Sequence, residues 1–364
     1  MNSLPLLLCL VNLLASAANA KLFALNDTET PHVFKLVEVD PGTGKRVVVG
    51  KPGADTDFPY VPWTTSVDRD NGVLYVLGQK NADLPAGNLT LLGVSLTTGM
   101  IVSTTPIPVE MDSYGLLYSS VAYAAELNLV ILSFTTSEKA HLLGTIDPAT
   151  PGSWNVVTSI DNPTAIGDVG GSGDGVYVPG QGEYIWQLGV NHVITQFAYN
   201  FKTATLRNAT SPQFTDFLFN PKDAMLYGHG VIAGPKQPGT GVQYWMRTLE
   251  KMDPATLLVS QVKVLDELSS DAGGAICLDP ENQILYWQSM LYKDAVAGGK
   301  MPVFIASVAL DKNNTVGLSE TDCEVAVFLF SGLTTTPATT KPPHCNAHCN
   351  PNPNPAGVAH ISGE

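Results

Sequence analysis

Acidic side chains gather in the segments that connect apolar stretches of this chain. Ten of them, with Lys51 as the one basic residue among them, are Asp55, Asp57, Glu110, Asp112, Asp161, Asp266, Glu267, Asp271, Glu320 and Asp322. Asp216 and Asn162 lie in comparable connections. Converging carboxylate and amide oxygens are what a hard cation such as Ca²⁺ requires, at about six to eight oxygen ligands. Acids are also common in the polar loops of any acidic protein, so a calcium site and simple solubility both remain open.

Cysteine supplies a second kind of chemistry. Apart from Cys9, near the N-terminus, the chain carries four cysteines: Cys277, Cys323, Cys345 and Cys349. An even number in an exported protein favours disulfides, and four cysteines allow three pairings. We favour Cys277–Cys323, with Cys345–Cys349 as the second pair. The two His–Cys pairs of "HCNAHC" at 344–349 would alternatively bind copper or zinc through imidazole and thiolate.

No nucleophile with a base at a recognisable spacing stands out. The sequence contains neither G-x-S-x-G nor H-E-x-x-H. His141, His192 and His229 are far apart along the chain, so we interpret them as structural histidines. We therefore predict no catalytic residue.

The first twenty residues have the features of a secretory leader. An apolar core, "LPLLLCLV" followed by "LLASA", precedes the A-x-A-like site "ANA" before Lys21. Four N-x-[ST] sequons, each in or beside a polar turn, stand at Asn26, Asn88, Asn208 and Asn313. We expect a secreted, N-glycosylated protein.

Composition limits the partners. The chain is 44% hydrophobic and 14% charged, enough to build a core, and its formal net charge is −14. Nucleic acids and anionic membranes both need a basic face, so we expect neither as a partner. After the leader no run of 18 uninterrupted apolar residues follows, so we expect no membrane insertion.

A repeated turn reveals the elements that position these residues. "DPGTGK" at 40–45 returns as "DPATPG" at 147–152 and "DPATLL" at 253–258, and weaker copies begin at Ser95, Asn200 and Asp311. The six copies follow one another at intervals of 52 to 58 residues. Asp or Asn accepts hydrogen bonds from amides two residues on, and Pro fixes φ for a tight turn. Because apolar stretches flank each copy, each predicts a strand hairpin.

An apolar motif, typified by "VLYVLG" at 73–78, is interleaved with these turns. Its equivalent positions are Phe23, Tyr75, Val130, Tyr177, Tyr227 and Tyr286. Each unit of about 50 residues then reads as four antiparallel strands, a to d, and a four-stranded sheet repeated radially is a propeller blade. No stretch shows a sustained 3.6-residue period, which excludes helical repeats. The sequence predicts an all-β, six-bladed propeller.

The ends of the chain predict how the ring closes. The first unit begins at strand b, "KLFALN", and an additional apolar strand, "CEVAVFLF" at 323–330, follows the sixth unit. We expect this C-terminal strand to complete the first blade, which ties both ends into one sheet. The domains are then a leader (1–20), the propeller (21–332) and a flexible Thr/Pro-rich tail with a short Cys/His segment (333–364).

The turns and the stretch "DPENQILYW" at 279–287 resemble the broad class of six-bladed propellers that includes NHL-repeat, YWTD-type and SMP-30/gluconolactonase-like proteins. In the lactonase-like members an axial Ca²⁺, held by carboxylates and amides, polarises the substrate. That resemblance implies a metal site, and its candidate ligands are Asp161, Asn162, Asp216, Asp271 and Glu324.

Two functions follow from these observations. The long irregular d–a and b–c loops share one face of the ring, and rigid scaffolds commonly carry binding groups on such loops. The first hypothesis is an extracellular binding, adhesion or matrix module that contacts a protein or glycan through this long-loop face. The second is a calcium-dependent hydrolase or lactonase with its site at the axial mouth.

Overall fold

The computed structural model describes residues 20–27, 33–51, 60–80, 88–110, 119–136, 140–150, 152–161, 175–190, 193–212, 214–236, 243–269, 276–290, 303–310, 314–321 and 333–334. The chain divides into two units, Met1–Thr334 and Thr335–Glu364, and every described residue belongs to the first. Within these ranges, no helix has both the length and the apolar character needed to cross a membrane.

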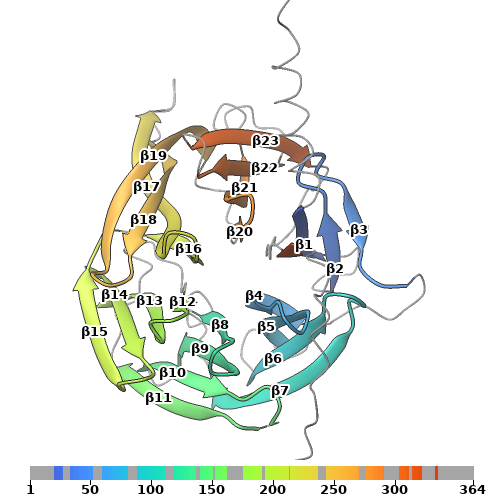
Figure 1. Ribbon diagram of the computed structural model, residues 1–364, viewed down its shortest axis with the longest axis vertical. Helices are drawn as coiled ribbons and strands as arrows, with labels where there is room; N and C mark the ends of the chain where they lie inside the picture. Colours follow the sequence, from blue (N-terminus) through green and yellow to red (C-terminus); the bar gives the residue numbers. More distant parts are fainter. Residues whose placement is uncertain are drawn as a thin grey trace, which may run out of the picture. The chain divides into compact units, whose positions relative to one another are not determined.

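The described residues form six four-stranded antiparallel sheets and contain no helix. Figure 1 shows the sheets standing around a common axis as the blades of a propeller, with β4, β8, β12, β16 and β20 nearest the axis. The predicted fold is therefore confirmed. We number the blades 1 to 6 in chain order.

Blades 2 to 6 each take four consecutive strands, of which the first is innermost and the fourth outermost. Blade 2 consists of β4 (Tyr60–Asp68), β5 (Val73–Lys80), β6 (Asn88–Ser95) and β7 (Ile101–Glu110). Blade 3 consists of β8 (Ser120–Ala124), β9 (Leu129–Thr135), β10 (Ala140–Ile146) and β11 (Asn155–Asp161). Blade 4 consists of β12 (Gly175–Val178), β13 (Glu183–Val190), β14 (Val193–Asn200) and β15 (Thr205–Thr210). Blade 5 consists of β16 (Thr215–Asn220), β17 (Met225–Lys236), β18 (Gln243–Asp253) and β19 (Leu258–Ser269). Blade 6 consists of β20 (Cys277–Asp279), β21 (Ile284–Met290), β22 (Val303–Ala309) and β23 (Thr315–Thr321).

Blade 1 joins the two ends of this unit. Its order is β24 (Leu333–Thr334), β1 (Ala20–Asp27), β2 (Phe34–Val39) and β3 (Arg46–Val48). A C-terminal strand thus completes the first blade, as expected. Its described part lies beyond the segment 323–330 that the sequence suggested, which is outside the described residues.

The repeated turn connects the two outer strands, c and d, of a blade, and its residues act as predicted. In blade 3 the Asp147 carboxylate accepts hydrogen bonds from the Ala149 amide (2.9 Å) and the Thr150 hydroxyl (2.7 Å). In blade 5 Asp253 accepts the same pair, from Ala255 (2.9 Å) and from the Thr256 hydroxyl (3.0 Å). The side chains of D-P-x-T therefore close the turn locally, which explains why the motif recurs.

The strand assignment in blade 4 was wrong. The sequence alignment made Tyr177, in "GVYVPG" at 175–180, equivalent to Phe23 of "KLFALN", which is a strand b. Tyr177 instead lies in β12, the innermost strand, and strand b is β13. Tyr177 pairs directly with Tyr184 of β13, so both strands carry an aromatic residue at the same level. The motif marked a buried strand without specifying which one.

An apolar cluster fills each of the six junctions between neighbouring blades. The junction of blades 3 and 4, for example, contains Trp186, and the junction of blades 5 and 6 contains Trp287, both almost completely buried. The core is therefore a ring of inter-blade layers, and each blade is buried on both faces.

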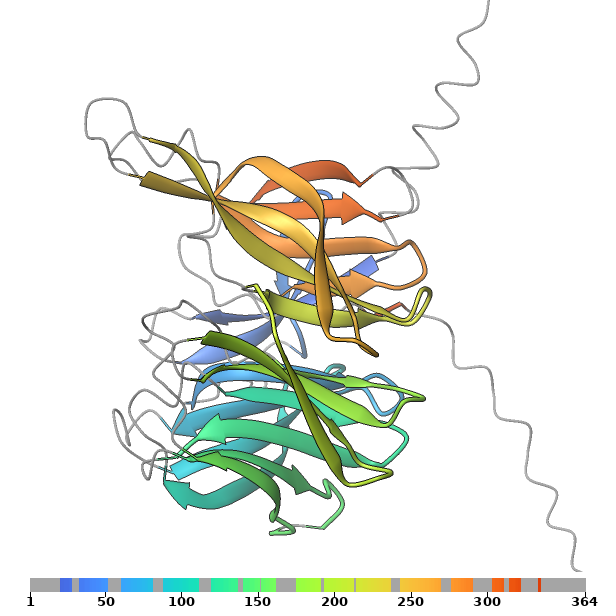
Figure 2. The ribbon, with the colours of Figure 1, turned by 90° about the vertical axis from the view of Figure 1, so that its left-hand side faces the viewer.

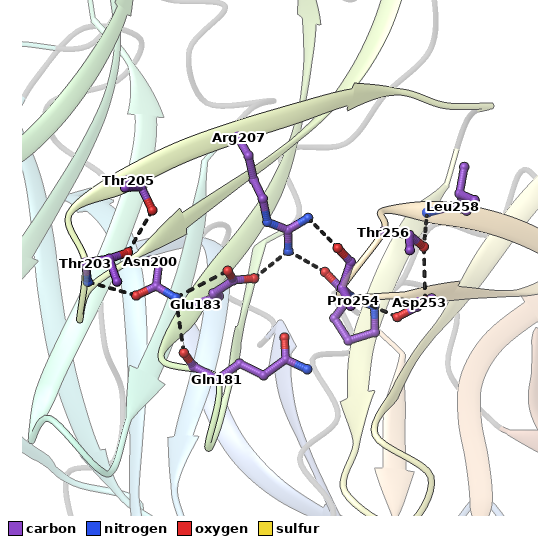
Figure 3. A network of polar contacts seen from close by, with 11 residues as sticks. Gln181, Glu183, Asn200, Thr203, Thr205, Arg207, Asp253, Pro254, Thr256 and Leu258 are labelled. Carbon is purple, nitrogen blue, oxygen red and sulfur yellow. Dashed lines mark hydrogen bonds and ion pairs between the residues drawn. The ribbon is translucent and has the colours of Figure 1, made fainter.

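A polar clasp adds to the apolar layer between blades 4 and 5 (Figure 3). Arg207 of β15 pairs with Glu183 (2.5 Å) and donates hydrogen bonds to the carbonyl oxygens of Ala255 (3.0 Å) and Pro254 (2.5 Å). These carbonyls belong to the D-P-x-T turn of blade 5. The clasp therefore fixes the turn of one blade against the outer strand of the preceding blade.

Candidate functional site

Blade 5 differs from the other blades in the length of its strands. β17, β18 and β19 have 12, 11 and 12 residues, whereas strands b and c of the other blades have six to eight. β16 pairs with β17 only as far as His229, but β17 and β18 stay paired out to Lys236 and Gln243. Figure 2 shows this hairpin reaching past the neighbouring blades. It projects at the b–c end, on the long-loop face.

Asp216 lies at the base of the hairpin, in an unusual conformation. It is the second residue of β16, its φ is 51°, and the pairing of β16 with β17 shifts register between Thr215 and Leu218. Asp tolerates positive φ better than most residues, and β-bulges redirect side chains. Both features turn its carboxylate toward β17 and β18.

Arg247 of β18 and His229 of β17 meet that carboxylate. Arg247 Nη1 donates to Asp216 Oδ2 at 3.1 Å and to His229 Nδ1 at 2.8 Å. Because Nδ1 accepts, the proton of the neutral imidazole lies on Nε2. The His229 ring meets Trp287 of blade 6 edge to face, with centroids 4.9 Å apart. The cluster therefore joins the three inner strands of blade 5, β16, β17 and β18.

The electrostatics of the cluster favour one ion pair and a neutral histidine. Burial lowers the pKa of His229 to about 4, and the guanidinium of Arg247 acts in the same direction. Burial by itself raises the pKa of Asp216, but the positive charge and the hydrogen bond of Arg247 favour the carboxylate, and that pKa stays below its ordinary value. Since the Asp216 side chain is 18% exposed and His229 fully buried, the arrangement anchors the hairpin and offers no accessible nucleophile.

The predicted calcium ligands lie partly within the described residues. Asp161 is exposed at the end of β11, the outermost strand of blade 3, and Asp216 is on the innermost strand of blade 5, so the structure does not bring these two together (Figure 1). Asn162, Asp271 and Glu324 lie outside the described residues. The described residues contain no group of three or more His, Cys, Asp or Glu side chains that would hold a metal. With a guanidinium against its carboxylate, Asp216 fits a cation poorly, and the site as a whole stays a prediction.

The remaining candidate residues have the following places. Cys277 is buried in β20, in the apolar layer between blades 6 and 1, and Cys323, Cys345 and Cys349 lie outside the described residues, so the disulfide pairing stays a prediction. Asn26 lies in β1, Asn88 begins β6, Asn208 is exposed on β15, and Asn313 is outside the described residues. The glycosylation of all four likewise remains an expectation.

Arg247 was missed at the level of sequence. It sits in "YWMRTL" at 244–249, where one basic residue interrupts a mostly apolar stretch, and that interruption was the available signal. A buried arginine requires a carboxylate, and β16 supplies one from 31 residues earlier in the chain.

No protein-family model and no curated protein matches this sequence. Solved structures do match its fold. A chain of a nidogen/laminin complex is 13% identical, with a TM-score of 0.51, and the match covers 86% of this chain and 97% of that one. The periplasmic gluconolactonase PpgL of Pseudomonas aeruginosa is 12% identical, with a TM-score of 0.47, and the match covers 86% and 99%. At these identities the likeness concerns the fold alone.

Proposed function

We propose that this protein is an exported, N-glycosylated propeller that binds an extracellular protein or glycan through its long-loop face, with the β17–β18 hairpin as the principal contact element. The observation that carries this proposal is the projection of that hairpin beyond the neighbouring blades (Figure 2). A strand rises about 3.3 Å per residue, so some four additional residues raise the tip by about 13 Å.

The base of the hairpin is built for rigid presentation. Arg247 is the register partner of Val231, where β17 leaves β16, and its contact with Asp216 ties β18 to the innermost strand. Along the free part of β17, Val231 and Ile232 are half-buried and Ala233 is exposed. Preorganised contact elements lose less entropy on binding, which favours affinity.

The similar fold in the nidogen/laminin complex is compatible with this proposal, because that structure is a complex of two proteins. The leader-like residues 1–20 and the four sequons support export and glycosylation. Mass spectrometry of the secreted protein, before and after enzymatic removal of N-glycans, tests that part directly.

The binding proposal is tested by shortening the hairpin. Ala233 and Trp245 are register partners, so an Asn-Gly turn in place of residues 234–244 closes the hairpin early and leaves Arg247 intact. The wild-type protein and the shortened variant are screened against immobilised extracellular-matrix proteins and a glycan array, and their melting temperatures are compared. We expect equal melting temperatures and loss of binding in the shortened variant.

Two results would count against the proposal. Undiminished binding by the shortened variant would place the contact elsewhere on the molecule. Turnover of simple esters or lactones that calcium supports and EDTA abolishes would favour the calcium-dependent hydrolase, the alternative motivated by the acidic connections.

A further inference from the structure

Glu250 of β18 is a buried carboxyl group that faces blade 4. It is directly paired with Gly228 of β17, and directly paired residues share one face of a sheet. On that face a side chain at Gly228 would meet the Phe214 ring and the Phe217 Cβ atom, and both of these residues belong to the layer between blades 4 and 5. Glu250 is 8% exposed.

The glycines of β17 make room for this carboxyl group. A Cβ atom at Gly230 would collide with the carboxylate of Glu250 and approach the Thr248 hydroxyl to 2.6 Å. The Thr248 hydroxyl in turn donates to Glu250 Oε1 at 3.0 Å. The "MLYGHG" stretch of β17 thus accommodates an acid that the apolar layer would otherwise exclude.

Two buried amides of blade 4 face the same junction. Gln196 donates to Gln187 Oε1 at 2.7 Å, and the Phe214 amide donates to the same oxygen at 3.1 Å. At this junction, three buried polar atoms keep no hydrogen-bond partner among the described residues: Glu250 Oε2, Gln187 Nε2 and Gln196 Oε1. The Gln187 atom is a donor and the Gln196 atom an acceptor, and a protonated carboxyl group offers both an acceptor and an O–H donor, whereas a carboxylate only accepts.

No cation in the described residues compensates Glu250. β17 faces it with glycines, and its partner on β19 is Gln261. On the blade 4 side the charged groups at this junction are Arg207 and Glu183, which pair with each other at the turn end (Figure 3). Arg247 and Lys263 belong to the opposite face, where Lys263 reaches the Asn314 carbonyl of blade 6. Burial therefore raises the pKa of Glu250, against a smaller opposing effect of the Thr248 hydrogen bond.

We propose that Glu250 is a pH-sensitive latch of the blade 4–blade 5 junction: protonated, it lets the two blades pack tightly, and ionised, it loosens them. An ionised carboxylate in this layer has no charge to balance it, so the junction opens to hydrate it. β17 and β18 continue directly into the projecting hairpin, so the state of this latch sets how firmly the hairpin is held against blade 4.

The test compares Glu250→Gln with the wild-type protein by hydrogen exchange, at about pH 5 and about pH 8. Comparison at one pH cancels the intrinsic effect of pH on exchange. The amide of glutamine copies the neutral acid, so at pH 8 we expect several-fold slower exchange in β13, β14, β17 and β18 of the variant, and equal exchange at pH 5. Asp70→Asn, at an exposed turn position of blade 2, is the control for the change from acid to amide and should behave as wild type.

Two results would overturn the proposal: the same exchange in both proteins at both pH values, or faster exchange in the variant at both. Infrared spectroscopy adds a second test, whose main observation is made on the wild-type protein. The wild-type protein should retain the C=O band of one protonated carboxyl group at pH values where its exposed carboxyl groups have already ionised, and Glu250→Gln should lack that band. Absence of that band from the wild-type protein would also reject the latch.

Discussion

On the face of blade 5 that packs against blade 6, a buried cation has its counter-ion: Arg247 lies 3.1 Å from Asp216 Oδ2, beside a neutral histidine. On the face that packs against blade 4, Glu250 has a hydroxyl from Thr248 and no compensating cation among the described residues. Both arrangements come from the same stretch of β18, because successive side chains of a strand point to opposite faces. Arg247 and Glu250 are three positions apart in β18, so their side chains lie on opposite faces of the blade.

The acids on the two faces of blade 5 should change the free energy of unfolding in opposite directions as pH rises. A carboxyl group held ionised by a cation stabilises the fold above its pKa, whereas one held neutral by burial destabilises the fold once it ionises. Blade 5 thus contains two acids, Asp216 on β16 and Glu250 on β18, whose conversion to amides should have opposite effects on stability.

The largest expected effect is that of Asp216→Asn. Asparagine keeps the size and tolerates the positive φ, so the substitution removes mainly the charge that balances Arg247. We expect a loss of about 3 kcal/mol in the free energy of unfolding, the range for breaking a mostly buried ion pair. Urea unfolding at neutral pH measures it.

The double variant Asp216→Asn/Arg247→Met is the control, because it removes both charges together. It should recover part of the loss, giving a coupling energy of about 1 kcal/mol or more. Glu250→Gln, the same chemical change on the other face, should raise stability at neutral pH. A loss of similar size in both single variants would remove the contrast between the faces.

The second prediction concerns acid and His229. Its folded pKa is about 4, below the ordinary 6.5, so between these values the unfolded chain binds more protons than the folded one. Stability should therefore rise as pH increases from about 4 to 6.5, with on the order of 3 kcal/mol from this one group. Melting temperatures across that interval measure the effect.

His229→Gln should flatten part of this slope. His141, whose burial lowers its pKa to about 3, contributes a further part with the same sign and keeps the remaining slope positive. Glu250 has the opposite sign, since its raised pKa makes stability fall as pH rises through the interval between its unfolded and folded values. If the slope of stability against pH were unchanged in His229→Gln, His229 would have to be hydrated in solution.

The fold could be predicted from the sequence because the repeated turns that mark the blades are stabilised by local hydrogen bonds. The D-P-x-T turn is closed by its own side chains, as at Asp147 and Asp253. Its three copies and the three weaker copies, at a near-constant spacing, therefore predict six hairpins. The error in blade 4 arose where a local signal is ambiguous. Tyr177 and Tyr184 face each other across β12 and β13, and an aromatic residue in an apolar run does not say which strand it occupies.

The candidate site could be predicted much less well from the sequence, since it depends on strand register and on packing against the neighbouring blades. Asp216 was selected as an acid in a connection, but the bulge that turns it toward Arg247 appears only in the pairing of β16 with β17. Glu250 read as one charge among the polar residues of "LEKMD". Its burial follows from the packing of blade 4 on that face, which no local pattern encodes.

The smallest expected effect lies at the turn end of the same junction, where Arg207 clasps the turn of blade 5 (Figure 3). The Arg207 side chain is 35% exposed, so solvent screens its pair with Glu183, and we expect Arg207→Ala to cost about 1 kcal/mol in urea unfolding. Arg207→Lys should lose most of the same amount, because an ammonium cannot contact two carbonyls and a carboxylate as a planar guanidinium does.

Combined with Glu250→Gln at about pH 8, Arg207→Ala shows whether the junction acts as one unit. If the exposed clasp and the buried acid are independent, their effects add within about 0.5 kcal/mol, and a larger coupling would mean that loosening one end of the junction loosens the other.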